Sequence, residues 1–304
     1  MPDRPNYLDP KTLNKVATLE LKARKVVEGM LSGMHKSPYR GFSIEFAEHR
    51  EYVPGDEIRH LDWKVYGRSD RFFIKQYEEE TNLRAMLCVD LSGSMDYRGE
   101  DAGMSKRDYA CTVAASLAHL LLRQRDAVGL TVFDREVATR LPWSSNPSHL
   151  RILCDTLARA ATRPATDVGA TLHALADELP RRGLIALFSD LLDDPERTLK
   201  GLRHLRHRDH DVMLFHVMDR DEVEFPFNAL TRFEGLEQSA PLMCDPRALR
   251  AAYRAEVDGF RTAVREGCLA NGVDYLEMLT DQPLDVALTA YLATRASRRG
   301  GRSR

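Results

Sequence analysis

The sequence has no apolar run long enough to cross a membrane. Its longest such run, residues 110–122, is interrupted by Thr112, Ser116 and His119 and falls short of the roughly 20 residues that a membrane-spanning helix requires. Residues 1–10 are polar and contain proline, so they do not form the apolar segment of a signal peptide. We therefore expect neither a membrane span nor export, and we predict a cytoplasmic protein.

The sequence contains few cysteines and has only a small net charge. The five cysteines are scattered without a close pair, which excludes a zinc cluster, and most have apolar neighbours, as is typical of buried thiols in a reducing compartment. The formal net charge is -2. The chain thus lacks the large basic excess that marks nucleic-acid-binding proteins, and we expect no nucleic-acid partner.

The chain is long enough to bury a substantial core. Its 304 residues, of which 43% are hydrophobic, fit one large domain or two modest ones. We predict an N-terminal helix and a small mixed α/β module in residues 1–83, and a main α/β domain in residues 84–296. A small insertion is expected at 222–245, and residues 297–304 form a basic tail.

The main domain has the pattern of a doubly wound sheet. From Arg84 onward, short apolar runs alternate with amphipathic segments, which predicts a mostly parallel, Rossmann-type sheet covered by helices on both faces. A shorter strand at residues 136–140 is expected to pair antiparallel with the strand before it, because Asp134 and Arg135 make a tight connection. The other expected strands are residues 84–89, 127–133, 184–188, 211–217 and 273–279.

Helices are indicated by their capping residues as well as by their spacing. Ser105 precedes a helix whose apolar residues between 110 and 121 follow the 3.6-residue period. Asp194 and Asp245 each stand before a proline, which favours a helix start because the first turn does not need the missing N–H. The second of these helices is expected to stop at Asn271-Gly272. The remaining predicted elements are helices at residues 11–31, 168–178 and 284–295, and a small hairpin within residues 225–243.

Polar side chains follow the first strand of the main domain. Asp90, Ser92 and Ser94 come directly after the apolar run at residues 85–89, on the loop that leaves the carboxyl end of a central strand. Open α/β sheets bind ligands at that edge. Alternate residues point the same way, and Gly93 lets the loop turn so that both hydroxyls face one point.

Two further oxygen ligands are expected from other loops at the same edge. Asp190 closes the run at residues 184–189, and Thr166 lies in the loop before the helix at 168–178. Carboxylate and hydroxyl oxygens suit Mg²⁺, Mn²⁺ or Ca²⁺ rather than softer metals. So few carboxylates would leave waters and an open coordination position. We therefore predict a divalent-cation site, with Mg²⁺ as the expected ion and Mn²⁺ or Ca²⁺ as alternatives.

This ligand pattern resembles that of a known protein family. Asp-x-Ser-x-Ser with a later threonine and a strand-end aspartate is similar to the metal-ion-dependent adhesion site of von Willebrand factor A domains, and the order of elements over residues 84–295 fits that fold. The resemblance implies that the serines contact the metal directly, that the other three ligands bind it directly or through water, and that a partner's carboxylate completes the shell. Thr162 and Thr171 remain alternatives for the threonine, because Pro164-Ala165 replaces the usual glycines. The five matching positions are Asp90, Ser92, Ser94, Thr166 and Asp190.

The segment before the main domain carries a second resemblance. Residues 50–56 (Arg-Glu-Tyr-Val-Pro-Gly-Asp), 58–64 (Ile-Arg-His-Leu-Asp-Trp-Lys) and 74–80 (Ile-Lys-Gln-Tyr-Glu-Glu-Glu) are similar to the signature of the bacterial domain of unknown function 58 family. The similarity extends over about residues 36–295. Members of this family commonly accompany MoxR-type AAA+ ATPases, which implies a role in ATPase-driven maturation or assembly of other proteins.

Two interpretations fit the charged residues of that signature. They form either an ion-pair network that fixes the module to the main domain or a partner-binding surface. Its tryptophan is either a packing anchor or a binding hot spot. Two acidic residues near the predicted metal would limit which acidic partners can dock. The candidate partner-binding residues are therefore Arg50, Asp56, Arg59, Asp62, Trp63, Lys64, Asp193 and Asp194.

Two classes of function fit the predicted site. The first is a binding module without enzymatic activity, in which the metal joins Ser92 and Ser94 to an acidic residue of another protein and a MoxR-type AAA+ ATPase is an expected partner. The alternative is a Mg²⁺-dependent phosphatase of the haloacid-dehalogenase type, with Asp90 as nucleophile and Asp190, Asp193 or Asp194 holding the metal. That chemistry resembles Asp-x-Asp, whose second carboxylate protonates the leaving group. Ser92 occupies this position and cannot act as a general acid near neutral pH, so the binding module is favoured.

Overall fold

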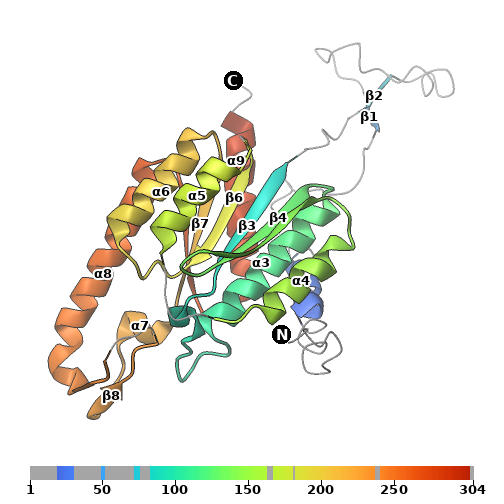
Figure 1. The fold of residues 1–304 in the computed structure, drawn as a ribbon. Helices are drawn as coiled ribbons and strands as arrows, with labels where there is room; N and C mark the ends of the chain where they lie inside the picture. The colour runs from blue at the N-terminus through green and yellow to red at the C-terminus, as the bar shows by residue number, and fades with distance from the viewer. Residues whose placement is uncertain are drawn as a thin grey trace, which may run out of the picture.

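The fold is built on a six-stranded sheet (Figure 1). The computed structural model describes residues 19–30, 49–51, 72–75, 83–162, 167–180, 182–236 and 240–301. The strands of the sheet are β3 (Arg84–Asp90), β4 (Ala127–Phe133), β5 (Val137–Ser144), β6 (Leu184–Ser189), β7 (Asp211–Met218) and β10 (Asp274–Leu279). They lie in the order β10-β7-β6-β3-β4-β5, and β5 alone among them runs antiparallel to its neighbour.

This strand order confirms the predicted fold class. Counted in chain order within the sheet it is 3-2-1-4-5-6, the order of a doubly wound α/β fold. It is also the fold that the resemblance to von Willebrand factor A domains implies. All six predicted strands are present, and β5, expected at residues 136–140, continues to Ser144.

Both faces of the sheet are buried, which explains why β3 has apolar residues at consecutive positions. Its side chains alternate between the faces: Leu87 and Val89 belong to one core cluster, and Met86 and Cys88 to the other. Helix α3 (Lys106–Arg123), α4 (His149–Arg159) and α9 (Leu284–Gly301) cover the first face. The second face is covered by α5 (Val168–Glu178), α6 (Pro195–His207) and α8 (Pro246–Ala270).

The N-terminal helix predicted at residues 11–31 is confirmed over residues 19–30, and its remaining residues lie outside the described ones. Ala23 and Val27 are fully buried, in the same core cluster as residues of α3 and α4. None of the helices in the described part of the chain is both long and apolar enough to cross a membrane.

The predicted capping residues begin their helices as expected. The N–H of Asp108 donates to the hydroxyl of Ser105 at 3.1 Å. Asp194 accepts from the N–H groups of Glu196 and Arg197, and Asp245 caps α8 in the same way.

Helix α9 continues to Gly301, so the predicted end at residue 295 is too early. Residues 296, 298 and 299 of the extension are Ala, Arg and Arg, which favour helix even without an apolar stripe, whereas Gly300 and Gly301 at its end do not. Sequence reasoning did not predict α4 or the short α7 (Arg220–Glu224).

Two small antiparallel strand pairs complete the sheets of the described residues. β8 (Thr231–Phe233) pairs antiparallel with β9 (Leu242–Cys244), which confirms the hairpin expected between residues 225 and 243. β1 (His49–Glu51) pairs antiparallel with β2 (Phe73–Lys75), and Arg50 lies in β1 opposite Ile74. The other predicted partner-binding residues of this module lie outside the described residues: Asp56, Arg59, Asp62, Trp63 and Lys64.

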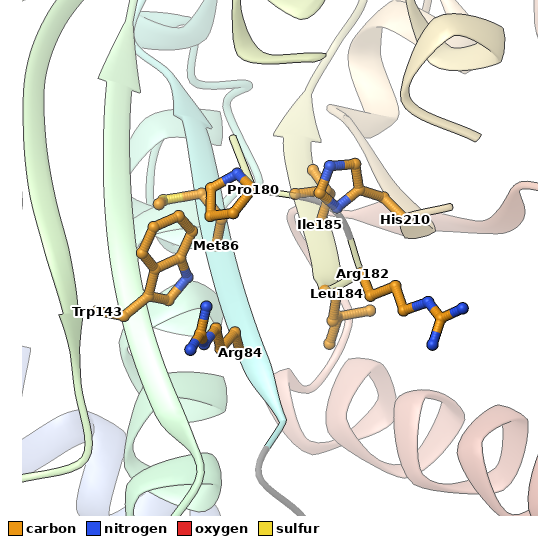
Figure 2. Close-up of a pocket in the computed structure, with 9 residues that line it drawn as sticks. Arg84, Met86, Trp143, Pro180, Arg182, Leu184, Ile185 and His210 are labelled. Carbon is orange, nitrogen blue, oxygen red and sulfur yellow. The ribbon is translucent and has the colours of Figure 1, made fainter. Parts of the chain in front are cut away.

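A small cleft lies at the amino ends of β3 and β6, the edge opposite the predicted site (Figure 2). Its lining includes Arg84, Trp143, Arg182 and His210, and none of its lining residues carries a carboxylate or a hydroxyl. This cleft therefore offers no carboxylate or hydroxyl side chain for a hard cation.

Candidate metal centre

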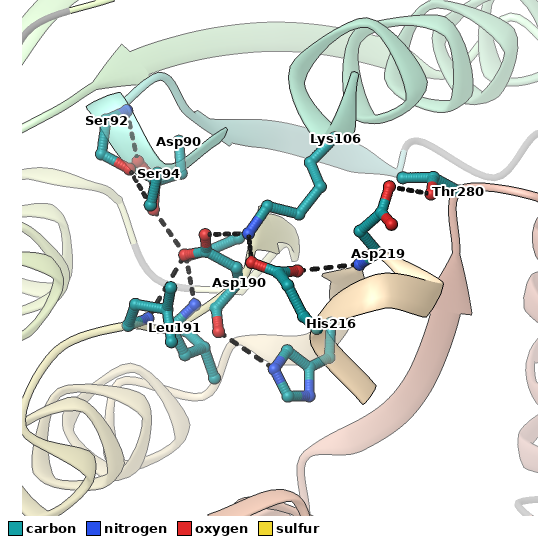
Figure 3. A network of polar contacts seen from close by, with 12 residues as sticks. Asp90, Ser92, Ser94, Lys106, Asp190, Leu191, His216, Asp219 and Thr280 are labelled. Atoms are coloured by element: carbon teal, nitrogen blue, oxygen red, sulfur yellow. Dashed lines mark hydrogen bonds and ion pairs between the residues drawn. The ribbon is translucent and has the colours of Figure 1, made fainter. Parts of the chain in front are cut away.

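The first part of the site is formed by the end of the central strand β3 and the turn that follows it. Asp90 is the last residue of β3, and the short 3-10 helix η2 (Gly93–Asp96) begins directly after Ser92. The N–H of Ser92 donates to Asp90 Oδ1 at 2.9 Å. The hydroxyls of Ser92 and Ser94 lie 3.1 Å apart, so both point toward the same place, as Figure 3 shows.

The second part comes from the end of the neighbouring strand β6. Asp190 follows β6 directly, and the hydroxyl of Ser94 hydrogen-bonds to its carboxylate. Ser189 donates its hydroxyl to Asp90 Oδ2 at 2.6 Å, which joins the two strand ends. Leu191 then adopts a φ of 54°, a left-handed conformation that costs a non-glycine residue about 1 kcal/mol or more. This turn lets the N–H of Leu192 donate to Asp190 Oδ1 at 3.2 Å.

The structure brings four of the five predicted ligands together: Asp90, Ser92, Ser94 and Asp190. Thr166 lies outside the described residues, so its assignment stays a prediction. Of the two alternatives, Thr162 donates its hydroxyl to the carboxylate of Asp96, and Thr171 is buried within α5.

Electrostatics distinguish the two buried carboxylates. Burial, reinforced by the negative charge of Asp190, raises the pKa of Asp90 to about 7, although hydrogen bonds from Ser189 and Ser92 oppose this shift. Burial also disfavours ionisation of Asp190, but the ammonium of Lys106 beside it holds its pKa below the ordinary value. Asp190 thus has a cation of its own, whereas the groups described above that donate to Asp90 are uncharged. When Asp90 is ionised, the site therefore carries negative charge that a further cation would offset.

Lys106 is the main residue that sequence reasoning did not predict. It is the first residue of α3 and is fully buried. Its Nζ lies 2.8 Å from Asp190 Oδ2 and 2.5 Å from Glu222 Oε1 (Figure 3). A signal existed, because a lysine directly after the capping Ser105 stands at the positive end of the helix dipole, where cations are disfavoured. Ser189 was also overlooked, although it immediately precedes Asp190.

A second layer of contacts holds the site loops. Asp219 accepts from the N–H of Gly99 at 3.1 Å and from the hydroxyl of Thr280 at 2.7 Å. A Cβ at Gly99 would lie 2.3 Å from an Asp219 carboxylate oxygen, so this position needs glycine for the close approach. His216 contacts the Asp190 carbonyl through Nε2 at 3.0 Å. Burial lowers the pKa of His216 to about 4, so its imidazole is neutral near pH 7 and its Nε2–H donates to that carbonyl.

The donor set fits a hard divalent cation. No group of three or more histidine, cysteine, aspartate or glutamate side chains suited to a metal occurs among the described residues, so a cation here depends on hydroxyls as well as two carboxylates. All the candidate donors are oxygens, which is the preference of Mg²⁺ and Ca²⁺. Adjacent oxygens around an octahedral Mg²⁺ lie about 3.0 Å apart, given bonds of about 2.1 Å. The 3.1 Å between the two serine hydroxyls is close to that spacing.

The two acidic residues expected to limit docking lie beside this site, on the loop that leads into α6. The N–H of Val168 donates to Asp193 Oδ2 at 3.0 Å, and Asp194 caps α6. Both carboxylates therefore accept backbone hydrogen bonds, Asp193 from the start of α5 and Asp194 from the first turn of α6. Their role in partner binding stays a prediction.

Comparisons of the sequence identify related proteins. A family model described as protein of unknown function DUF58 matches residues 48–263. Uncharacterized proteins of Mycobacterium bovis (Mb1516) and Mycobacterium tuberculosis (Rv1480) are each 29% identical to this chain over 297 residues, which is 96% of this chain and 92% of the relative.

Similar solved structures share the general fold at low identity. The conserved hypothetical protein BatB from Bacteroides thetaiotaomicron is 15% identical with a TM-score of 0.45, covering 71% of this chain and 99% of that one. The SpRpn10 VWA domain is 10% identical with a TM-score of 0.38, covering 68% of this chain and 93% of that one. Similarities of this size carry no argument about function.

Proposed function

This chain belongs to the DUF58 family of proteins of unknown function, and from the geometry of its strand ends we propose that it is a metal-dependent protein-binding module. The observation that carries the proposal is the convergence of four oxygen-bearing side chains at the carboxyl edge of the sheet. Two of them are buried carboxylates, and the uncharged partners of Asp90 leave its charge uncompensated when it is ionised.

The proposed ligands are the residues that already contact one another: Asp90, Ser92, Ser94 and Asp190, with Thr166 as a fifth from the family resemblance. Mg²⁺ is the expected ion, with Mn²⁺ or Ca²⁺ as alternatives. Such an ion, when bound, supplies a positive centre that a carboxylate of another protein can ligate. The chain's own residues hold the ion and neutralise part of its charge, and the partner's acid contributes the rest.

A binding role is supported over an enzymatic one by the surroundings of Asp90. In a phosphatase of the haloacid-dehalogenase type this carboxylate would be the nucleophile. Here it is fully buried, and its two oxygens accept from the N–H of Ser92 and the hydroxyl of Ser189. Ser92 stands where a general acid would be needed and cannot protonate a leaving group near neutral pH. We therefore propose that the chain is not an enzyme.

The proposed partner is a MoxR-type AAA+ ATPase, or a client that such an ATPase helps to mature or assemble. This follows from the resemblance of residues 50–80 to the family signature, since members of that family commonly accompany such ATPases. The partner would present an acidic side chain to the cation. The residues beside the ion that it would meet include Asp193 and Asp194, whose charge disfavours acidic surfaces without a well-placed carboxylate.

The test is the capture of a purified MoxR-type ATPase from the same genome on the tagged protein, with Mg²⁺ or with EDTA. Asp90→Asn keeps the shape of the side chain but removes its charge, and we expect at least a tenfold loss of recovered ATPase, about 1.4 kcal/mol. EDTA should have the same effect on the wild-type chain. A matched control is Asp155→Asn, on the exposed surface of α4. Equal recovery with and without chelator, from protein loaded with Mg²⁺ beforehand, would refute a bridging cation.

A further inference from the structure

Lys106 is a buried ammonium held between acidic residues of two separate segments. Its side chain is fully buried and contacts Asp190, after β6, and Glu222, in α7. Burying a charge costs several kcal/mol before its partners compensate, and the start of a helix is an unfavourable place for a cation. Neither core packing nor helix formation explains a lysine here, so its role follows from the carboxylates that it contacts.

One of those carboxylates is shared with the candidate metal centre. Asp190 accepts from Lys106 through Oδ2 at 2.8 Å, and its carboxylate also receives the hydroxyl of Ser94. The same group therefore faces the ammonium on one side and the proposed cation ligands on the other. Any divalent ion that binds there shares Asp190 with a positive charge that is already in place, and like charges repel strongly in a buried site.

Glu222 is the second acidic partner of the Lys106 ammonium. Its Oε1 lies 2.5 Å from Nζ, and its Oε2 accepts from the N–H of Asp219 at 2.8 Å, which fixes the carboxylate in a capping box. Lys106 can therefore give up part of its interaction with Asp190 and keep a charged partner. The position of the ammonium between two acids is the feature that a purely structural ion pair does not require.

We propose that Lys106 is a built-in counter-cation that sets the affinity of the metal centre, with Glu222 as the residue that draws its charge away from Asp190. This inference rests on the proposed metal-dependent function. Without a divalent ion, the ammonium compensates Asp190. When the ion binds, Lys106 remains paired with Glu222. Affinity for the ion alone is thereby kept low, so that a partner's carboxylate adds the missing negative charge and the ion and the partner bind cooperatively.

The test measures Mg²⁺ affinity by calorimetry at pH 8 for four forms of the full chain. Lys106→Met keeps an unbranched side chain that is one atom shorter and removes its charge, and we expect Mg²⁺ to bind at least tenfold more tightly. Glu222→Gln removes a negative charge and leaves the ammonium to Asp190, so we expect binding at least tenfold weaker. Lys200→Met, on the exposed surface of α6, makes the same change in net charge as Lys106→Met and should leave the affinity unchanged.

The two substitutions at the site should act in opposite directions, and circular dichroism establishes that each variant is folded. If Lys106→Met does not fold, Glu222→Gln alone tests the proposal. Mg²⁺ binding that is at least tenfold weaker in this variant supports it, and unchanged binding overturns it. Binding by Lys106→Met but not by the wild-type chain would support the proposal. Equal or weaker binding in Lys106→Met, with normal binding by the wild type, would overturn this inference and leave the metal centre intact. If no form binds Mg²⁺, the proposed function fails along with it.

Discussion

Helices α5 and α6 approach each other closely, with a glycine from each helix, Gly169 and Gly201, at the contact. A Cβ added at Gly201 would lie 2.7 Å from the Cβ of Leu172 and 3.1 Å from the carbonyl oxygen of Gly169. Both atoms belong to or adjoin the backbone of α5, so they cannot yield unless that helix moves. Because α6 follows the loop that carries Asp190, this contact also helps to hold the candidate metal centre.

The expected cost of Gly201→Ala combines two terms of opposite sign. Replacing a glycine inside a helix by alanine stabilises a protein by about 0.5–1 kcal/mol, whereas overpacking a close contact costs about 1–3 kcal/mol. We therefore expect a net loss of about 1 kcal/mol. Gly259 in α8 is the matched control, because an added Cβ there meets no atom within 4 Å. Gly259→Ala should stabilise the protein by about 0.5–1 kcal/mol.

The assay is urea unfolding of both variants together with thermal unfolding. Since both gain the same helix-propensity term, the difference between them measures the α5–α6 contact, about 1–3 kcal/mol. At roughly 2–4 °C per kcal/mol for a chain of this size, Gly201→Ala should melt a few degrees below the wild type and Gly259→Ala a few degrees above it. If both variants gained the same stability, the close approach of the two helices would be refuted.

Two further predictions concern the cation. We expect one Mg²⁺ per chain to raise the melting temperature by mass action in the wild type but not in the double variant Ser92→Ala/Ser94→Ala. The control is Ser144→Ala/Ser148→Ala at the opposite edge of the sheet, where Ser144 pairs with Val128 near the start of β4, and undiminished binding in the first double variant would mean that the site is misplaced. We also expect no Mg²⁺-dependent hydrolysis of aryl phosphates or nucleotides by the pure protein. Turnover that disappears in Asp90→Asn would favour the phosphatase alternative instead.

The position of the candidate site along the chain could be predicted because it depends on local order. Asp90 and Asp190 each follow an apolar run of strand length, and in a doubly wound sheet such residues lie at the carboxyl edge. The helix starts at Ser105, Asp194 and Asp245 were also predictable, since a capping side chain bonds to an N–H only two or three residues away. These features are determined by the sequence itself, over a few residues at a time.

Helix α4 was overlooked although its buried residues Leu150, Leu153, Cys154 and Leu157 follow the helical period, whereas α7 lacks such a local signal. Helix α7 is only five residues long, too short for a helical period to be visible. Its capping box at Asp219 and Glu222 was present in the sequence, but an aspartate followed three residues later by a glutamate is too common to mark a helix without an apolar run beside it.

The charge balance of the site was decided by tertiary structure alone. Lys106 contacts Asp190 across 84 positions of the chain and Glu222 across 116, and Ser189 reaches Asp90 across 99. These contacts form because β3 and β6 are neighbours in the sheet. They also require that α3 begins beside the carboxyl ends of both strands. Periodicity and capping act over single turns and strands, so the ligands that follow each strand could be read from short segments of sequence. The packing of the sheet against the helices is what brings a lysine among them.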